Sequence, residues 1–181
     1  MAVAGPRLAG GLVDDTGLGT ATWVITGTVC AVTLTAGASS HYLFATSFGF
    51  SLPSDSSVQG IRVAIGHLAN VATLRDSAVR LLKAGVVTGS SEALGAAWPE
   101  LLASTDYGGA SDLWDSTWAP SDVNGGGFGV GFAAVNTDAL VPGIATAQDI
   151  SIRVDYALSQ TGPTESALKK SYGHMLGIGR F

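Results

Sequence analysis

Hydrophobic and polar positions alternate with a period of two along much of this chain. The clearest run covers residues 150–158, where the apolar positions are Ile150, Ile152, Val154, Tyr156 and Leu158. Successive side chains of a β-strand point to opposite faces of the sheet, so this run predicts a half-buried strand. The same pattern predicts strands at 42–52 (with Tyr42, Phe44, Phe48, Phe50 and Leu52 on one face), 61–65, 79–82 and 128–134.

Turn-forming residues separate these runs, for example Pro53-Ser54-Asp55-Ser56 and Asn124-Gly125. Short alternating strands joined by such turns predict an all-β protein, an antiparallel β-sandwich of jelly-roll type. Earlier strands are expected in residues 23–34, with a change of phase around Gly27 to Cys30. Only residues 91–102 suggest a short helix, and Pro99 argues against its continuing.

The two ends of the chain lack this clear strand pattern. We therefore divide the chain into an extended N-terminal arm (1–20), a β-sandwich domain (21–158) and a basic C-terminal tail (159–181). The tail carries three basic residues against Glu165, whereas the whole chain has a net charge of −5. This contrast favours docking of the tail onto an acidic neighbour, and a solvated terminus is the alternative. The expected partner contacts are Lys169, Lys170, Tyr172, Leu176, Arg180 and Phe181.

Composition narrows the classes of function. Charged residues form 13% of the 181-residue chain, against about 25% in a typical globular protein, and the mean hydropathy is positive. No apolar stretch is long enough to predict a membrane span, and the acidic balance gives no support for nucleic-acid binding. We therefore expect other protein subunits, including copies of this chain, to cover part of the surface. The single Cys30 lies among apolar residues and is expected to be buried.

No catalytic motif is recognisable, so no enzymatic activity and no cofactor are predicted. His41, His67 and His174 lack the spacing of metal ligands, and a lone cysteine adds little to a zinc site. The acidic residues Asp106, Asp112, Asp115 and Asp122 offer oxygen ligands for Ca²⁺, but aspartate also stabilises turns by bonding nearby backbone N–H groups. Turn formation is the favoured interpretation, and no metal site is predicted.

Residues 107–124 combine two tryptophans, a tyrosine, several aspartates and turn-forming glycines. One interpretation is a ligand platform for stacking sugars, formed by Trp98, Tyr107 and Trp118. The favoured one is that Trp114 and Trp118 close one end of the sandwich core, because large aromatic side chains usually bury most of their area.

Four blocks of this chain, spanning about residues 21–158, resemble a known family. They are Phe48-Gly49-Phe50-Ser51-Leu52-Pro53 with Gly60-Ile61-Arg62-Val63, then Tyr107-Gly108-Gly109 with Ser111-Asp112-Leu113-Trp114, then residues 118–130 with Trp118-Ala119-Pro120-Ser121-Asp122, and residues 149–156. Together they are similar to β-sandwich domains of tailed-bacteriophage virion proteins. Asp115 departs from the pattern, because glycine is common there and a left-handed backbone is harder for aspartate.

The resemblance implies a structural or adhesive role in a virion, with the protein made in the cytoplasm of the bacterial host. It supplies no catalytic residues. The leading hypothesis is a capsid decoration protein or a tail-attached adaptor or fibre component, which packs against other virion proteins. The alternative is a carbohydrate- or receptor-binding module of the particle that uses the Trp-rich segment 107–124 to recognise a host-surface glycan, and a hydrolase is a third, disfavoured hypothesis.

Overall fold

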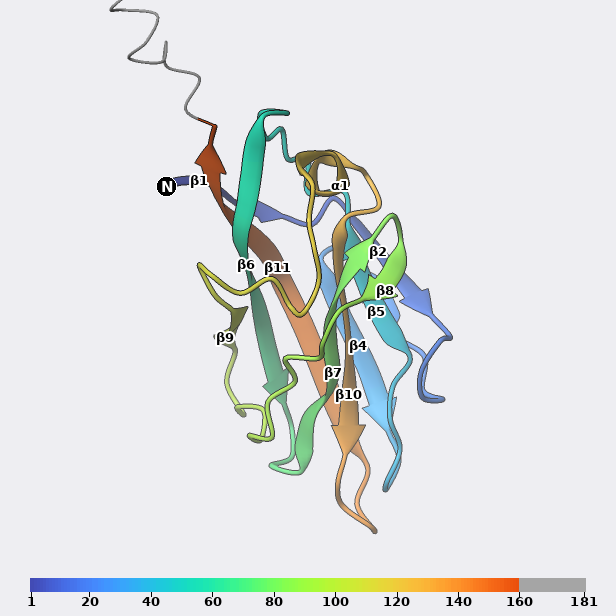
Figure 1. Cartoon of the computed structure of the whole chain (residues 1–181). Coiled ribbons are helices and arrows are strands. Elements are labelled where there is room, and N and C mark those ends of the chain that lie inside the picture. The colour runs from blue at the N-terminus through green and yellow to red at the C-terminus, as the bar shows by residue number, and fades with distance from the viewer. Residues whose placement is uncertain (160–181) are drawn as a thin grey trace, which may run out of the picture.

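The computed structural model describes residues 1–159, which form two antiparallel β-sheets packed face to face (Figure 1). The predicted antiparallel β-sandwich is confirmed. Sheet A has the order β3-β4-β11-β6-β9, with β1 also paired to β11, and its strands are β1 (Ala2–Leu8), β3 (Val24–Thr26), β4 (Val29–Leu34), β6 (Ser56–Ala69), β9 (Ala103–Gly108) and β11 (Gly143–Leu158). Sheet B has the order β2-β5-β10-β7-β8, with β2 (Gly11–Asp15), β5 (Tyr42–Thr46), β7 (Leu74–Lys83), β8 (Val86–Thr88) and β10 (Gly129–Asn136).

Strand β11 organises sheet A. Along one edge it pairs with β6 over nearly its whole length. Its other edge is shared, because β4 pairs with residues 143–147 and β1 pairs with residues 151–156. The alternation that predicted this strand is confirmed in its core-facing positions, where Ile150, Ile152 and Val154 are buried.

The space between the sheets is filled by the alternating apolar positions of both sheets. The largest fully buried side chains include Trp114, Phe128, Phe132, Leu34, Leu43, Ile61 and Leu81. Cys30 is also fully buried, as expected from its apolar neighbours. In the described part of the chain, no helix is both long and apolar enough to cross a membrane.

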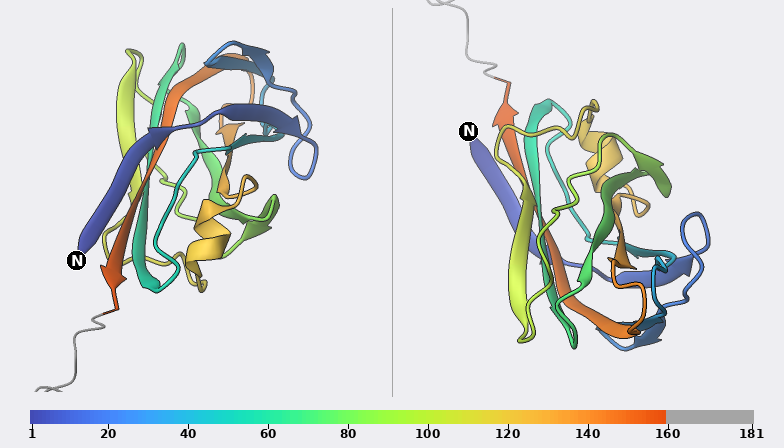
Figure 2. Two further views of the ribbon diagram at one scale, coloured as in Figure 1. Left: turned by 90° about the horizontal axis from the view of Figure 1, so that it is seen from above. Right: turned by 90° about the horizontal axis from the view of Figure 1, so that it is seen from below.

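The N-terminal segment differs from the expected extended arm. Residues 2–8 pair with β11 in sheet A and residues 11–15 pair with β5 in sheet B, so the chain crosses between the sheets at Leu8–Gly11 (Figure 2). Side chains of β1 are largely exposed on both faces. A strand that is held mainly by backbone hydrogen bonds leaves little alternation in its sequence, and this explains why the pattern did not reveal it.

Residues 42–52 form a short strand followed by a turn, and not one continuous strand, so this prediction was wrong. Strand β5 ends at Thr46, and the chain then turns through left-handed backbone at Ser47 and Gly49. As a result, Phe44 lies on the outer face of sheet B, whereas Phe48 and Phe50 enter the core. Residues 91–102 form no helix, and the only helix among residues 1–159 is α1 (Pro120–Asn124).

Candidate functional site

A hollow of about 220 Å³ opens on the outer face of sheet A. Its floor is formed by the central strands β6 and β11, and its sides by β1 and β9. We call it the sheet A hollow, and its lining residues are Pro6, Arg62, Ala64, Asp106, Ser151 and Arg153. The strand register brings them together: Arg62 lies opposite Arg153, and Ala64 lies opposite both Ser151 and Asp106.

The alternation of β6 and β11 explains why these side chains face outward. Ile61 and Val63 point into the core, so Arg62 between them must point away from it. On β1, the register shifts between Ala4 and Arg7, which places Pro6 at the side of the hollow. Gly5 permits this close approach, because a Cβ there would lie 2.7 Å from the carbonyl oxygen of Ile152.

Arg62 and Arg153 are half-buried neighbours of like charge. Like charges directly opposite each other on adjacent strands destabilise a sheet unless an anion lies between them. Within residues 1–159, neither guanidinium forms an ion pair, since the two ion pairs there are His41–Asp14 and Lys83–Asp122. The Nε atom of Arg153 is buried and has no hydrogen-bond partner among these residues. A buried donor left unpaired costs about 1–3 kcal/mol.

Two carboxylates accompany the arginines. Asp106 is exposed on the β9 side of the hollow. Asp155 is 3% exposed, follows Arg153 by two positions on β11, and its Oδ2 atom has no partner among the described residues. The hollow and its margin therefore contain hydrogen-bond donors and acceptors that the described chain does not use.

A second polar cluster lies at the edge of the core, around a hollow of about 50 Å³. One carboxylate oxygen of Asp76 accepts hydrogen bonds from Trp98 Nε1 at 2.8 Å and from the Tyr107 hydroxyl at 3.2 Å. The His67 ring stacks on Trp98 with 4.4 Å between ring centroids, and its Nε2 lies 3.1 Å from Thr105 Oγ1. His67 Nδ1 is buried without a partner among residues 1–159.

Burial governs the protonation of these groups. It lowers the pKa of His67, although the nearby Asp76 carboxylate acts in the opposite direction. Burial raises the pKa of Tyr107 well above its usual range, and Asp76 adds to this effect. Burial likewise raises the pKa of the Cys30 thiol to about 11, so Cys30 is not a thiolate nucleophile at neutral pH.

The three residues proposed as a stacking platform lie in the interior. Trp98, Tyr107 and Trp118 are 3%, 2% and 7% exposed, so none presents an open ring face to solvent. Trp114 is fully buried and donates its Nε1 hydrogen to the carbonyl oxygen of Ile61 at 2.9 Å. The favoured interpretation, that Trp114 and Trp118 belong to the core, is confirmed.

The aspartates of this segment stabilise turns. Asp112 Oδ1 accepts a hydrogen bond from the Trp114 N–H at 2.7 Å, and Asp122 Oδ2 accepts one from the Ala119 N–H at 2.9 Å. Asp115 has a φ of 50°, which is the left-handed backbone anticipated where glycine is common. The part of the chain that the structure describes has no cluster of three or more residues suited to a metal ion.

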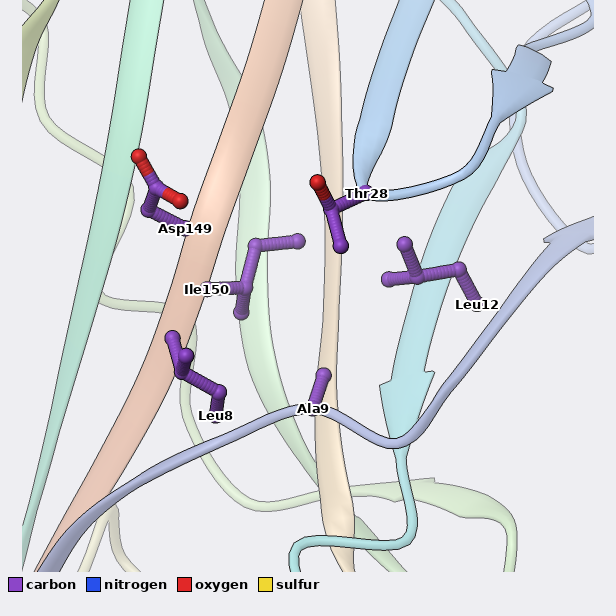
Figure 3. Close-up of a pocket in the computed structure, with 6 residues that line it drawn as sticks. All are labelled: Leu8, Ala9, Leu12, Thr28, Asp149 and Ile150. Atoms are coloured by element: carbon purple, nitrogen blue, oxygen red, sulfur yellow. The ribbon is translucent and has the colours of Figure 1, made fainter.

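A small apolar hollow of about 40 Å³ lies where the chain crosses between the sheets (Figure 3). Its lining residues are Leu8, Ala9, Leu12, Thr28, Asp149 and Ile150. Leu8 is 65% exposed, and the strands that meet here expose further large apolar side chains, Val13, Val24, Ile25 and Val29. The predicted partner contacts of the tail, and His174, lie outside the described residues.

Comparisons with known proteins give no match to a family model and none to a curated protein. Among solved structures, the chain is similar to a CBM4 structure (9% identity, TM-score 0.47, 81% of this chain and 95% of that one). It is also similar to the second N-terminal cellulose-binding domain of Cellulomonas fimi β-1,4-glucanase C (15%, 0.45, 83% and 92%). A third is a family 11 carbohydrate-binding module of a Clostridium thermocellum cellulosomal cellulase (12%, 0.42, 90% and 100%). These likenesses concern the fold alone.

Proposed function

We propose that this chain is a non-catalytic binding module that holds a glycan in the sheet A hollow. The observation that carries the proposal is the set of unused polar side chains on an otherwise regular sheet face. Arg62, Arg153, Ser151 and Asp106 line one hollow, and none of them forms a side-chain hydrogen bond to another described residue. A polar surface left open in this way suits a ligand rich in hydroxyl groups.

The chemistry of the lining matches that of a sugar. A sugar hydroxyl both donates and accepts hydrogen bonds; guanidinium groups donate, a carboxylate accepts and a serine hydroxyl does both. Ala64 and Pro6 add a small apolar surface for the C–H groups of a ring. The volume of about 220 Å³ is below the roughly 300–1,000 Å³ of enclosed ligand sites, so we expect shallow binding of modest affinity.

A glycan array followed by calorimetric titration of the hits tests this proposal. Arg153→Gln removes the charged donor group at the floor, and we expect it to weaken binding at least about tenfold, which corresponds to about 1.4 kcal/mol. Arg80→Gln is the matched control, because Arg80 lies on sheet B and donates to the carbonyl oxygen of Gly89. Absence of any glycan ligand, or turnover of a bound glycan, would contradict the proposal.

A second candidate is the structural role in a tailed-phage virion, as a decoration protein or a tail-attached component. The resemblance of the sequence blocks supports it, and so do the exposed large apolar side chains on edge strands of sheet A. Leu8 on β1 and Val24 on β3 are 65% and 66% exposed. Covering such surface with a neighbouring subunit contributes about 25 cal/mol per Å² before the costs of association.

Retention on purified particles and self-association in the ultracentrifuge test this second candidate. We expect the double variant Leu8→Ser, Val24→Ser to lose both, because it removes apolar contact area without opening the core. Leu101→Ser is the control, since Leu101 is 83% exposed and lies in the segment before β9. A parent protein that stays monomeric and does not bind particles would exclude this role.

A further inference from the structure

The pair Arg62 and Arg153 indicates which kind of glycan the hollow would bind. This inference rests on the function proposed above. The two residues are direct partners in the register of β6 and β11. Directly opposed residues on antiparallel strands have Cα atoms about 4.5–5.5 Å apart, so both side chains leave the sheet at nearly the same place. Two cations are thereby concentrated on the floor of one hollow.

The described chain does not neutralise this pair. Neither arginine has an ion-pair partner or a side-chain hydrogen bond among residues 1–159, and neither lies over an aromatic ring in the way that Arg7 lies over Phe50. A hydroxyl group can pair with one N–H of Arg153. A carboxylate can accept two parallel hydrogen bonds from a guanidinium, and such charge-assisted bonds are roughly twice as strong.

The negative charges nearby limit what this anion can be. Asp106 is exposed on β9 and lies opposite Ala64. It precedes by two positions Gly108, the residue of β9 that pairs with Arg62. Asp155 lies beside Gly60, and the Gly109–Ala110 backbone covers Gly60 so closely that a Cβ there would lie 2.3 Å from the carbonyl carbon of Ala110. These carboxylates would repel a polyanion, but the exposed Asp106 can accept a hydrogen bond from a hydroxyl group.

We propose that the sheet A hollow selects a sugar that carries a single carboxylate, of the uronic or sialic acid type. The carboxylate lies between Arg62 and Arg153, and the hydroxyl groups of the same ring contact Ser151 and Asp106. The site needs both an anion for the arginines and hydroxyl groups for Ser151 and Asp106. Neutral sugars lack the anion, and simple acidic peptides lack the ring hydroxyl groups, so we expect both to bind more weakly.

The test compares matched ligands by calorimetric titration of the full chain. The pairs are methyl galacturonide against methyl galactoside and 3′-sialyllactose against lactose, each acidic sugar carrying one carboxylate, with a tetraglutamate peptide as a third probe. We expect at least one acidic sugar to bind tenfold or more tightly than its neutral partner. We also expect Arg62→Gln and Arg153→Gln each to abolish that preference, and added salt to weaken it. Arg80→Gln, on sheet B and away from the hollow, removes a guanidinium of the same kind and should retain the preference.

The outcomes separate this inference from the function on which it rests. Equal binding of acidic and neutral sugars, or an acidic preference that survives both arginine substitutions, overturns the inference and leaves glycan binding standing. Binding of tetraglutamate as tightly as the best acidic sugar also overturns it, in favour of an acidic peptide. If no sugar of the panel or the array binds, both the inference and the proposed function are wrong.

Discussion

His67 shows how a single residue depends on its surroundings. The ring is 3% exposed and lies flat against Trp98, with an interplanar angle of 7°. Its Nε2 faces Thr105 Oγ1, and the Asp76 carboxylate partly offsets the effect of burial on its pKa. Because burial disfavours the charged form, the native state holds His67 neutral at pH values where an unfolded histidine is protonated.

The stability of the protein should therefore fall as the pH drops below about 6.5, the ordinary pKa of histidine. In that range the unfolded chain binds a proton that native His67 does not, and the free energy of unfolding rises with pH by at most about 1.4 kcal/mol per unit. Urea unfolding of the parent and of His67→Gln between pH 5 and 8 measures this slope. The variant should be less pH-dependent than the parent, and parallel curves would show that His67 does not contribute.

Asp76 allows a second prediction at this scale. Its carboxylate accepts hydrogen bonds from the Trp98 and Tyr107 side chains and from the Leu94 N–H at 2.8 Å. Asp76→Ala leaves two largely buried donors without a partner, and we expect a loss of about 2–4 kcal/mol in the free energy of unfolding. Asp55→Ala is the control, because Asp55 is exposed and has no side-chain hydrogen bond among residues 1–159. A similar, small effect of both variants would show that the Asp76 cluster is not stabilising.

At the scale of elements, the connection from β9 to α1 depends on one glycine. Gly108 has a φ of +68°, and a Cβ there would lie 2.5 Å from both the Ile61 carbonyl oxygen and Trp114 Nε1. The hydrogen bond between these two groups fixes the Trp114 ring in the core, so the end of β9 must pass directly beside it. This close approach explains why a glycine stands immediately after Tyr107.

Gly108→Ala should therefore destabilise the protein by more than about 2 kcal/mol, because it combines an unfavourable backbone conformation with a contact that backbone atoms cannot relieve. Gly126→Ala is the matched control, since its Cβ would meet nothing within 4 Å and its φ is not positive. Differential scanning calorimetry of the two variants measures the difference in Tm. Equal Tm values would mean that the corner relaxes easily.

At the scale of the whole molecule, the sequence predicted the elements that bury one face. Strands β6, β10 and β11 follow from their alternation, and so does the sandwich. Strand β1 was missed because it is largely exposed on both faces and so carries no such alternation, and β2 was missed because it is short and packs only Leu12 against the core. The hollow could not be predicted, because alternation places Arg62 and Arg153 on outer faces but does not give the register between strands separated by some 90 positions in sequence.

The C-terminal tail, residues 159–181, gives a prediction about attachment to a neighbouring subunit. The described residues 1–159 already form an extensive buried core, so we expect removal of residues 164–181 to leave the Tm of the domain nearly unchanged. If the tail anchors the protein to a neighbouring subunit, the same truncation should abolish its retention on particles. Unchanged retention would show that the tail is not the anchor, and a large fall in Tm would show that the domain needs it.

The central place of β11 has a consequence for biosynthesis. Strands β1, β4 and β6 are made early, yet each has β11 as a hydrogen-bonding neighbour in sheet A. While the ribosome is still translating residues 143–158, these strands have open edges that can pair with other chains. The nascent protein must therefore wait for its last described strand before sheet A can close, which predicts late, cooperative folding and a need for protection from aggregation during synthesis.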